Sequence, residues 1–147
     1  MTQRERVLQA LVDALATGFI GLGVSPEVRR GGELPTRIPP GGMIVLRDGE
    51  AGEPEITLSP PLYEYRHRAE IEVFLQPATG GDPAAAMDGL IEDIGVVLAV
   101  DRTLGGLCLW VEPEAPVLSE LALEGAAGIV AAIVPVDLTY ITTGPLA

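Results

Sequence analysis

The sequence predicts an α+β fold in which two helices pack on one face of an antiparallel β-sheet that also carries a β-hairpin. Two segments, residues 3–17 and 82–100, repeat apolar residues at helical spacing. Between and after them lie short apolar or alternating stretches separated by Gly and Pro, which is typical of strands. The expected order is therefore helix, three strands, helix and two or three strands, in a single domain over residues 1–147.

The first helix has clear signals at both ends. Thr2 and Glu5 have the spacing of a capping box, and Gly18 is the predicted stop. Between them runs an apolar stripe that consists of Val7, Leu8, Leu11, Val12 and Leu15. Residues 19–24 are apolar and short, and are expected to be either a tail of this helix or a small strand.

Residues 24–42 form the least regular part of the chain. They are rich in Pro and Gly, contain Arg29, Arg30 and Arg37, and lack a clear period. A long segment of this kind is commonly functional or disordered. We expect an extended arm or loop, and the sequence leaves both an interaction role and plain disorder open.

Three strands are expected next. Residues 43–46 and 55–58 are predicted to pair as a hairpin with an exposed polar tip at 48–54. Residues 65–76 alternate, which predicts a strand with one wet face. Its inward side chains are predicted to be Ala69, Ile71, Val73 and Leu75, and its wet face is predicted to carry Arg68, Glu70, Glu72, Phe74 and Gln76.

Residues 82–110 are predicted to be the unit around which the rest of the chain packs. Asp82 can cap a helix whose first position is Pro83. The predicted apolar face of that helix consists of Met87, Leu90, Ile91, Ile94, Val97 and Leu98. Gly89 and Gly95 weaken helix propensity, which suggests close approach of another backbone. Gly105 and Gly106 then turn the chain into a predicted buried strand at 107–111.

The last segments are also predicted to be strands. Residues 117–123 form a possible short strand, and residues 129–142 form the longest candidate. The long candidate is apolar on both faces, which indicates a central position in the sheet or a partner on the second face. Pro135 has no N–H group, so a bulge or an edge is expected there.

The charge is unevenly distributed along the chain. The net charge is −12, and all nine cationic side chains are Arg. Residues 1–68 hold eight Arg and nine acids, whereas residues 69–147 hold one Arg and twelve acids. An acidic half disfavours direct nucleic-acid binding, because it repels phosphates. Its charge is expected either to keep the protein soluble or to form a surface past which DNA slides without binding. No apolar run has the length of a membrane span, and a soluble protein without a secretion signal is expected.

We find no pattern of residues typical of a catalytic or metal site. His67, the single histidine, is expected to be solvent-facing or hydrogen-bonded, and Cys108 is expected to be a buried thiol. The acidic groups could bind a divalent ion or form a solvated face, and the second role is expected. These groups are Glu112 with Glu114, and Asp88 with Glu92 and Asp93. Neither Gly31-Gly32 nor Gly105-Gly106 fits a phosphate-binding loop. Arg66 and Arg68 are expected to pair with Glu64 or Glu70.

Three segments resemble a known family. Residues 101–107 (DRTLGGL), which follow an Ala-containing helix, look like the Asp-x-Thr-Leu-Gly-Gly turn of tail-terminator and tail-completion proteins of long-tailed phages and gene transfer agents. Residues 134–143 (VPVDLTYITT) are similar to the last strand of these proteins, and residues 65–73 (YRHRAEIEV) to the start of their middle strand. The order of the three segments and the chain length extend the resemblance over most of the chain, with residues 24–42 matching least.

The resemblance implies a non-enzymatic virion protein without cofactor or metal. Such proteins form a ring, expected to be a hexamer, on the tail tube, stop tube growth and present a docking surface for the head connector. The implied partners are other copies of the chain, the tail tube protein and the connector or stopper protein. DNA would pass through the lumen without specific binding, and no membrane is involved. The implied location is the neck-to-tail junction of a virion assembled in the host cytoplasm. Two alternatives remain: a neck, stopper or other completion protein, or a small enzyme or ligand-binding domain that uses His67, Cys108 or the acidic cluster.

Overall fold

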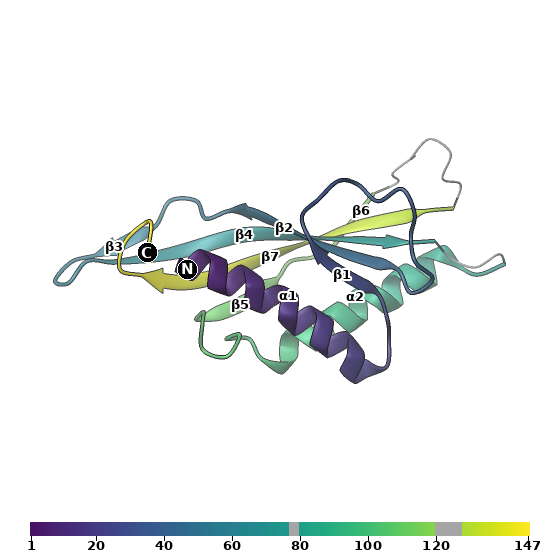
Figure 1. The fold of residues 1–147 in the computed structure, drawn as a ribbon, viewed down its shortest axis with the longest axis horizontal. Helices are drawn as coiled ribbons and strands as arrows, with labels where there is room; N and C mark the ends of the chain where they lie inside the picture. The colour runs from purple at the N-terminus through teal and green to yellow at the C-terminus, as the bar shows by residue number, and fades with distance from the viewer. Residues whose placement is uncertain (77–79, 120–127) are drawn as a thin grey trace.

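The fold is α+β, as predicted, and the described residues form two helices and one seven-stranded sheet (Figure 1). The computed structural model describes residues 1–76, 80–119 and 128–147. The helices are α1 (Gln3–Leu22) and α2 (Pro83–Val100). The strands are β1 (Glu27–Arg30), β2 (Met43–Glu50), β3 (Glu55–Thr57), β4 (Leu62–Leu75), β5 (Trp110–Pro113), β6 (Val117–Ser119) and β7 (Val130–Thr142). Neither helix is long and apolar enough to cross a membrane, within the residues described.

The sheet is built around β4 and β7. Its order is β1-β2-β4-β7-β5, with β3 paired to β4 and β6 paired to β7. All pairs are antiparallel except β1 with β2. The β4–β7 register runs without interruption from Tyr63 opposite Thr142 to Leu75 opposite Val130. The long last strand is therefore central, as its two apolar faces predicted.

Helix α1 is longer than predicted because Gly18 does not end it. Thr2 caps the N-terminus, where its hydroxyl accepts a hydrogen bond from the Glu5 N–H at 3.2 Å. The helix ends at Gly23, which has the left-handed backbone (φ 74°) that favours glycine. Gly18 lies inside the helix at its contact with α2, where a Cβ atom would come 2.4 Å from Val97 Cγ1. Glycine serves close packing at this position, and residues 19–22 are the helix tail.

Helix α2 begins and packs as predicted. The Asp82 carboxylate accepts hydrogen bonds from the N–H groups of Ala84 and Ala85, and Pro83 is the first helical residue. The buried residues are Met87, Leu90, Ile94, Val97 and Leu98. The close approach suggested for Gly89 and Gly95 is not present, because an added Cβ at either position meets no described atom within 4 Å. The tight helix–helix contact uses Gly18 of α1 instead.

The predicted hairpin between residues 43–46 and 55–58 is wrong in its pairing. Strand β2 continues to Glu50 and pairs with β4, with Leu46 opposite Ile71. Strand β3 also pairs with β4, with Ile56 opposite Tyr63, so the hairpin that forms joins β3 to β4. Gly49 lies in a register shift of the β2–β4 pair between Arg47 and Glu50, where a Cβ would lie 1.8 Å from the Arg68 carbonyl oxygen. Part of the predicted tip at 48–54 therefore belongs to the sheet.

The segment 24–42 contains a strand that the sequence analysis missed. Strand β1 lies parallel to β2, with Glu27 opposite Met43. The rest of the segment crosses the sheet face opposite the helices, where Ile38 is buried in a second small core. The other members of that core are Met43, Val45, Phe74, Ile129 and Ala131. Phe74, predicted to face solvent, is buried because this segment covers it.

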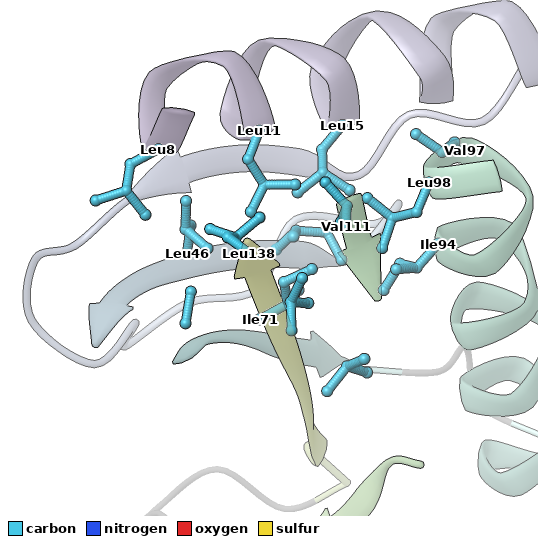
Figure 2. Close-up of a cluster of buried hydrophobic side chains, with 14 of the residues drawn as sticks. Leu8, Leu11, Leu15, Leu46, Ile71, Ile94, Val97, Leu98, Val111 and Leu138 are labelled. Atoms are coloured by element: carbon cyan, nitrogen blue, oxygen red, sulfur yellow. The ribbon is translucent and has the colours of Figure 1, made fainter. Parts of the chain in front are cut away.

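The main core lies between the helices and the sheet (Figure 2). Helix α1 contributes Leu8, Leu11 and Leu15, and α2 contributes Ile94, Val97 and Leu98. These side chains meet Leu46, Ile71, Val111 and Leu138 of the sheet, which come from four different strands. Burial of the apolar stripes that the sequence predicted thus holds both helices on one sheet face.

The segments around β5 and β6 differ from prediction in extent. The strand predicted at 107–111 is observed as β5 at Trp110–Pro113, and only Val111 within it is fully buried. Of the strand predicted at 117–123, Val117–Ser119 forms β6, and residues 120–123 lie outside the described residues. Pro135 causes no bulge against β4, since it lies in register opposite Glu70. Its carbonyl accepts from the Glu114 N–H between β5 and β6, so its missing N–H faces a gap between those strands.

Candidate assembly surfaces

His67 is completely buried and serves as a structural link within the sheet. Its Nδ1 lies 2.9 Å from the Tyr140 hydroxyl, and its Nε2 contacts the carbonyl oxygen of Asp48. A carbonyl can only accept, so Nε2 carries the proton and Nδ1 accepts from the Tyr140 hydroxyl. Burial lowers the pKa of His67, which favours this neutral form. The solvent-facing role left open by the sequence does not occur.

A group of ion pairs lies next to His67 and ties α1, β1 and β2 together. The Arg30 guanidinium donates to both carboxylate oxygens of Glu5, at 2.7 and 2.8 Å, and to those of Asp48, at 2.8 and 2.9 Å. Its hydrogen bonds hold the pKa values of both carboxyls below their usual range. Arg4 approaches Asp48 at 3.4 Å. The sequence analysis missed this group, because no spacing pattern relates residues 5, 30 and 48.

Cys108 is a buried thiol, as predicted. Its Sγ lies 3.7 Å from the Arg102 carbonyl oxygen, and burial raises its pKa to about 11. A thiol with this pKa is protonated near neutral pH and is a weak nucleophile. The neighbouring turn is closed by Asp101, whose carboxylate accepts from the Thr103 hydroxyl and from the N–H groups of Thr103 and Gly105. This turn satisfies its own polar groups.

The acidic candidates are not brought together into a metal site. In residues 1–76, 80–119 and 128–147, no group of three or more His, Cys, Asp or Glu side chains could hold a metal ion. Asp88 and Glu92 are exposed on α2. Glu112 accepts hydrogen bonds from Trp110 Nε1 at 2.7 Å and from Arg102 at 3.3 Å.

The arginines of β4 pair across the sheet and not along their own strand. Arg66 approaches Asp137 at 3.6 Å, and Arg68 donates to Glu114 at 3.0 Å. The prediction that they pair with Glu64 or Glu70 is therefore wrong. In the β4–β7 register Arg68 lies opposite Asp137 and Arg66 lies opposite Thr139, so Asp137 is the diagonal neighbour of Arg66 on the adjacent strand. Burial and the adjacent Glu114 raise the pKa of Asp137.

Exposed apolar side chains occur on both helices and on strands that include β3, β5 and β6. Ile56 and Leu58, in and after β3, are 53% and 79% exposed. In β6, Val117 and Leu118 are 59% and 72% exposed. Trp110 of β5 is half exposed, and the Arg102 guanidinium carbon lies 5.4 Å from its ring centroid. Exposed apolar and aromatic residues with a nearby arginine are typical of protein-binding surfaces.

Comparison with known proteins adds no relative. No protein-family model matches this chain, and no curated protein sequence matches it at a significant level.

Proposed function

We propose that this chain is a structural subunit of a virion, of the tail-terminator kind. Copies of it form a ring on the end of the tail tube, stop tube growth and provide the docking surface for the head connector. The observation that carries the proposal is the spatial arrangement of the three resembling segments. Residues 65–73 pair in register with residues 132–140 in the centre of the sheet, and residues 101–107 lead into β5, which pairs with β7. The three segments therefore form one contiguous unit of the fold.

The remaining surfaces support an assembly role. His67 and Cys108 are buried and take part in internal contacts, whereas β3, β5 and β6 each carry exposed apolar side chains. A ring needs two different surfaces on each subunit that fit each other head to tail. This chain offers exposed apolar surfaces on β3, β5 and β6.

The charge distribution supports a channel for DNA. Helix α2 has no basic residue and exposes Asp88 and Glu92. A channel lined by such a surface repels phosphates, so DNA passes without binding. We propose that the acidic half of each subunit lines the lumen.

The direct test is imaging of tail tubes purified from the particle whose genes accompany this one. Purified chain carrying a small gold label is added to the tubes, which are examined by negative-stain microscopy. Label at one tube end, together with shorter tubes when the chain is present during tube assembly, is the expected result. The proposal is refuted if tube ends remain unlabelled and tube lengths do not change.

A second measurement separates this proposal from an enzyme or ligand-binding domain. Cys108→Ala removes the thiol while keeping a small apolar side chain, so tube capping is expected to persist. His67→Ala is unsuitable here because it removes a buried, hydrogen-bonded ring and alters folding. Label at the head side of the neck in intact particles would identify a neck or stopper protein instead.

A further inference from the structure

The hairpin formed by β3 and the start of β4 projects beyond the helices (Figure 1). We name residues 49–61 the acidic hairpin, because they contain Glu50, Glu53 and Glu55 and no basic residue. None of these three carboxylates makes an ion pair or a side-chain hydrogen bond with another described residue. Ile56 and Leu58 add exposed apolar surface. A projecting hairpin with an apolar tip is typical of a segment that docks on another molecule.

Two carboxylates also face each other where the hairpin joins β4, and a cationic partner would reduce the repulsion between them. Glu55 of β3 lies directly opposite Glu64 of β4. Side chains that are directly opposite in an antiparallel pair share one face and lie close together, so two carboxylates there repel each other. Within the isolated chain, the described residues provide no arginine partner for either carboxylate. This arrangement favours a partner that brings positive charge.

A surface of the required charge lies over the other half of the sheet. We name residues 29–42 the basic loop, because they contain three Arg and one Glu. Arg30 is already bonded to Glu5 and Asp48, so Arg29 and Arg37 supply the positive charge that the loop offers to a partner. Ile38 on its underside is buried against the sheet, which fixes the loop in place. Its outer side exposes Arg37 and Leu34, the latter 46% exposed. Arg29 uses Nη2 to donate to the Glu33 carbonyl at 2.7 Å, whereas its Nε has no partner among the described residues.

We propose that the acidic hairpin of one copy docks on the basic loop of the next copy. Figure 1 shows the hairpin at one end of the sheet and the loop over the other half, so a chain does not reach its own loop. The two surfaces differ, and their contact is head to tail, which generates a ring if it closes. The acidic half of a neighbour, residues 69–147 with twelve acids and one Arg, repels the hairpin and leaves the basic loop of the nearly neutral first half as its target. This inference rests on the proposed ring and names the surfaces that join its subunits.

Charge reversal on each surface, followed by mixing, tests this contact. The hairpin variant is Glu53→Arg/Glu55→Arg, and the loop variant is Arg29→Glu/Arg37→Glu. Sedimentation velocity of the full chain at low salt (about 50 mM) is expected to show association of the wild type that weakens at about 0.5 M salt. Each variant alone is expected to associate at least about tenfold more weakly, because like charges then meet at the contact. Mixing the two variants restores association, since every junction in an alternating ring again joins opposite charges.

A matched control separates the local contact from net charge. Asp88→Arg/Glu92→Arg changes the net charge by the same amount as the hairpin variant but lies on α2, and it is expected to leave association unchanged. Far-UV circular dichroism checks that every variant is folded. If the double loop variant is not folded, the single variant Arg37→Glu replaces it. The contact is refuted by a wild type that stays monomeric at low salt, by an equal loss in the α2 variant or by a mixture that does not recover. If the wild type is monomeric but still caps tubes, the hairpin–loop contact is refuted and the proposed function is not. If the wild type forms salt-sensitive rings that do not bind tube ends, the proposed function is refuted and the contact is not.

Discussion

Replacing Gly18 with Ala is expected to destabilise the protein, although alanine is the better helix former. An added Cβ would lie 2.4 Å from Val97 Cγ1 and 2.7 Å from Cγ2. Ordinary carbon contacts lie at about 3.5–4.0 Å, so α1 and α2 must separate locally by roughly 1 Å. Overpacking costs about 1–3 kcal/mol, and two Val97 methyl groups inside 3 Å place this substitution in the upper part of that range, at about 2–3 kcal/mol. The helix-propensity gain from alanine offsets about 1 kcal/mol of this cost. The expected net loss is about 1–2 kcal/mol, which lowers Tm by roughly 3–6 °C for a domain of this size.

The same substitution at Gly95 is the matched control. Gly95 lies within α2, and an added Cβ there meets no described atom within 4 Å. Gly95→Ala is therefore expected to stabilise the protein by about 0.5–1 kcal/mol. Combining Gly18→Ala with Val97→Ala makes room for the new methyl group, so the double variant is expected to lose less stability than the sum of the two single variants.

Urea unfolding followed by circular dichroism measures these differences, with the m-value as a check on two-state behaviour. A Gly18→Ala protein as stable as the wild type would show that the helices do not contact each other closely at this position. Strict additivity in the double variant would refute the assignment of the effect to Val97.

Three further predictions concern His67, Gly49 and Cys108. The pKa of His67 is lowered by burial, and Arg4, Asp48 and Tyr140 are the charged or titratable groups that face it. As pH falls from about 7, the unfolded chain binds the histidine proton before the folded chain does, so the free energy of unfolding decreases until the pH reaches the folded-state pKa. In urea titrations at several pH values, His67→Gln should show a weaker dependence of the free energy of unfolding on pH. Gly49→Ala places a methyl group 1.8 Å from a carbonyl oxygen at φ 64°, and a loss of at least about 2 kcal/mol is expected by thermal unfolding. The Cys108 thiol, with its pKa near 11, should react with a disulfide reagent much more slowly in the native protein than in urea, which absorbance measures.

The sequence predicted the parts of the fold that depend on local signals. Asp82 and Pro83 mark the start of α2 by their own hydrogen-bonding chemistry, and the structure places both as predicted. The apolar stripes of the two helices and the central position of β7 also followed from periodicity and hydrophobicity.

The parts that were missed depend on which distant segments meet. Residues 43–46 and 55–58 read as a hairpin, yet β4 is long enough to pair with both β2 and β3. Gly18 reads as a helix stop because sequence alone does not reveal the Val97 side chain that excludes any larger residue there. Phe74 reads as exposed because burial of that face requires the segment that carries Ile38.

The candidate surfaces were predicted only in part. The acidic excess and the interaction potential of residues 24–42 follow from composition, whereas β1 within that segment does not, because a short parallel strand has no period of its own. The Arg30 group with Glu5 and Asp48 joins three separate elements, so no spacing in the sequence indicates it.

The central place of β7 has a consequence for how the chain folds. Strand β4 finds its main partner far along the chain: His67 and Tyr140, which bond to each other, are 73 positions apart. Sheets that depend on such distant contacts close slowly, commonly in milliseconds to seconds, because a large loop must be ordered first. Until β7 arrives, β4 presents an unpaired edge beside the acidic hairpin. During synthesis and refolding this interval is when aggregation competes with folding, and the acidic residues of the neighbouring hairpin keep such intermediates apart.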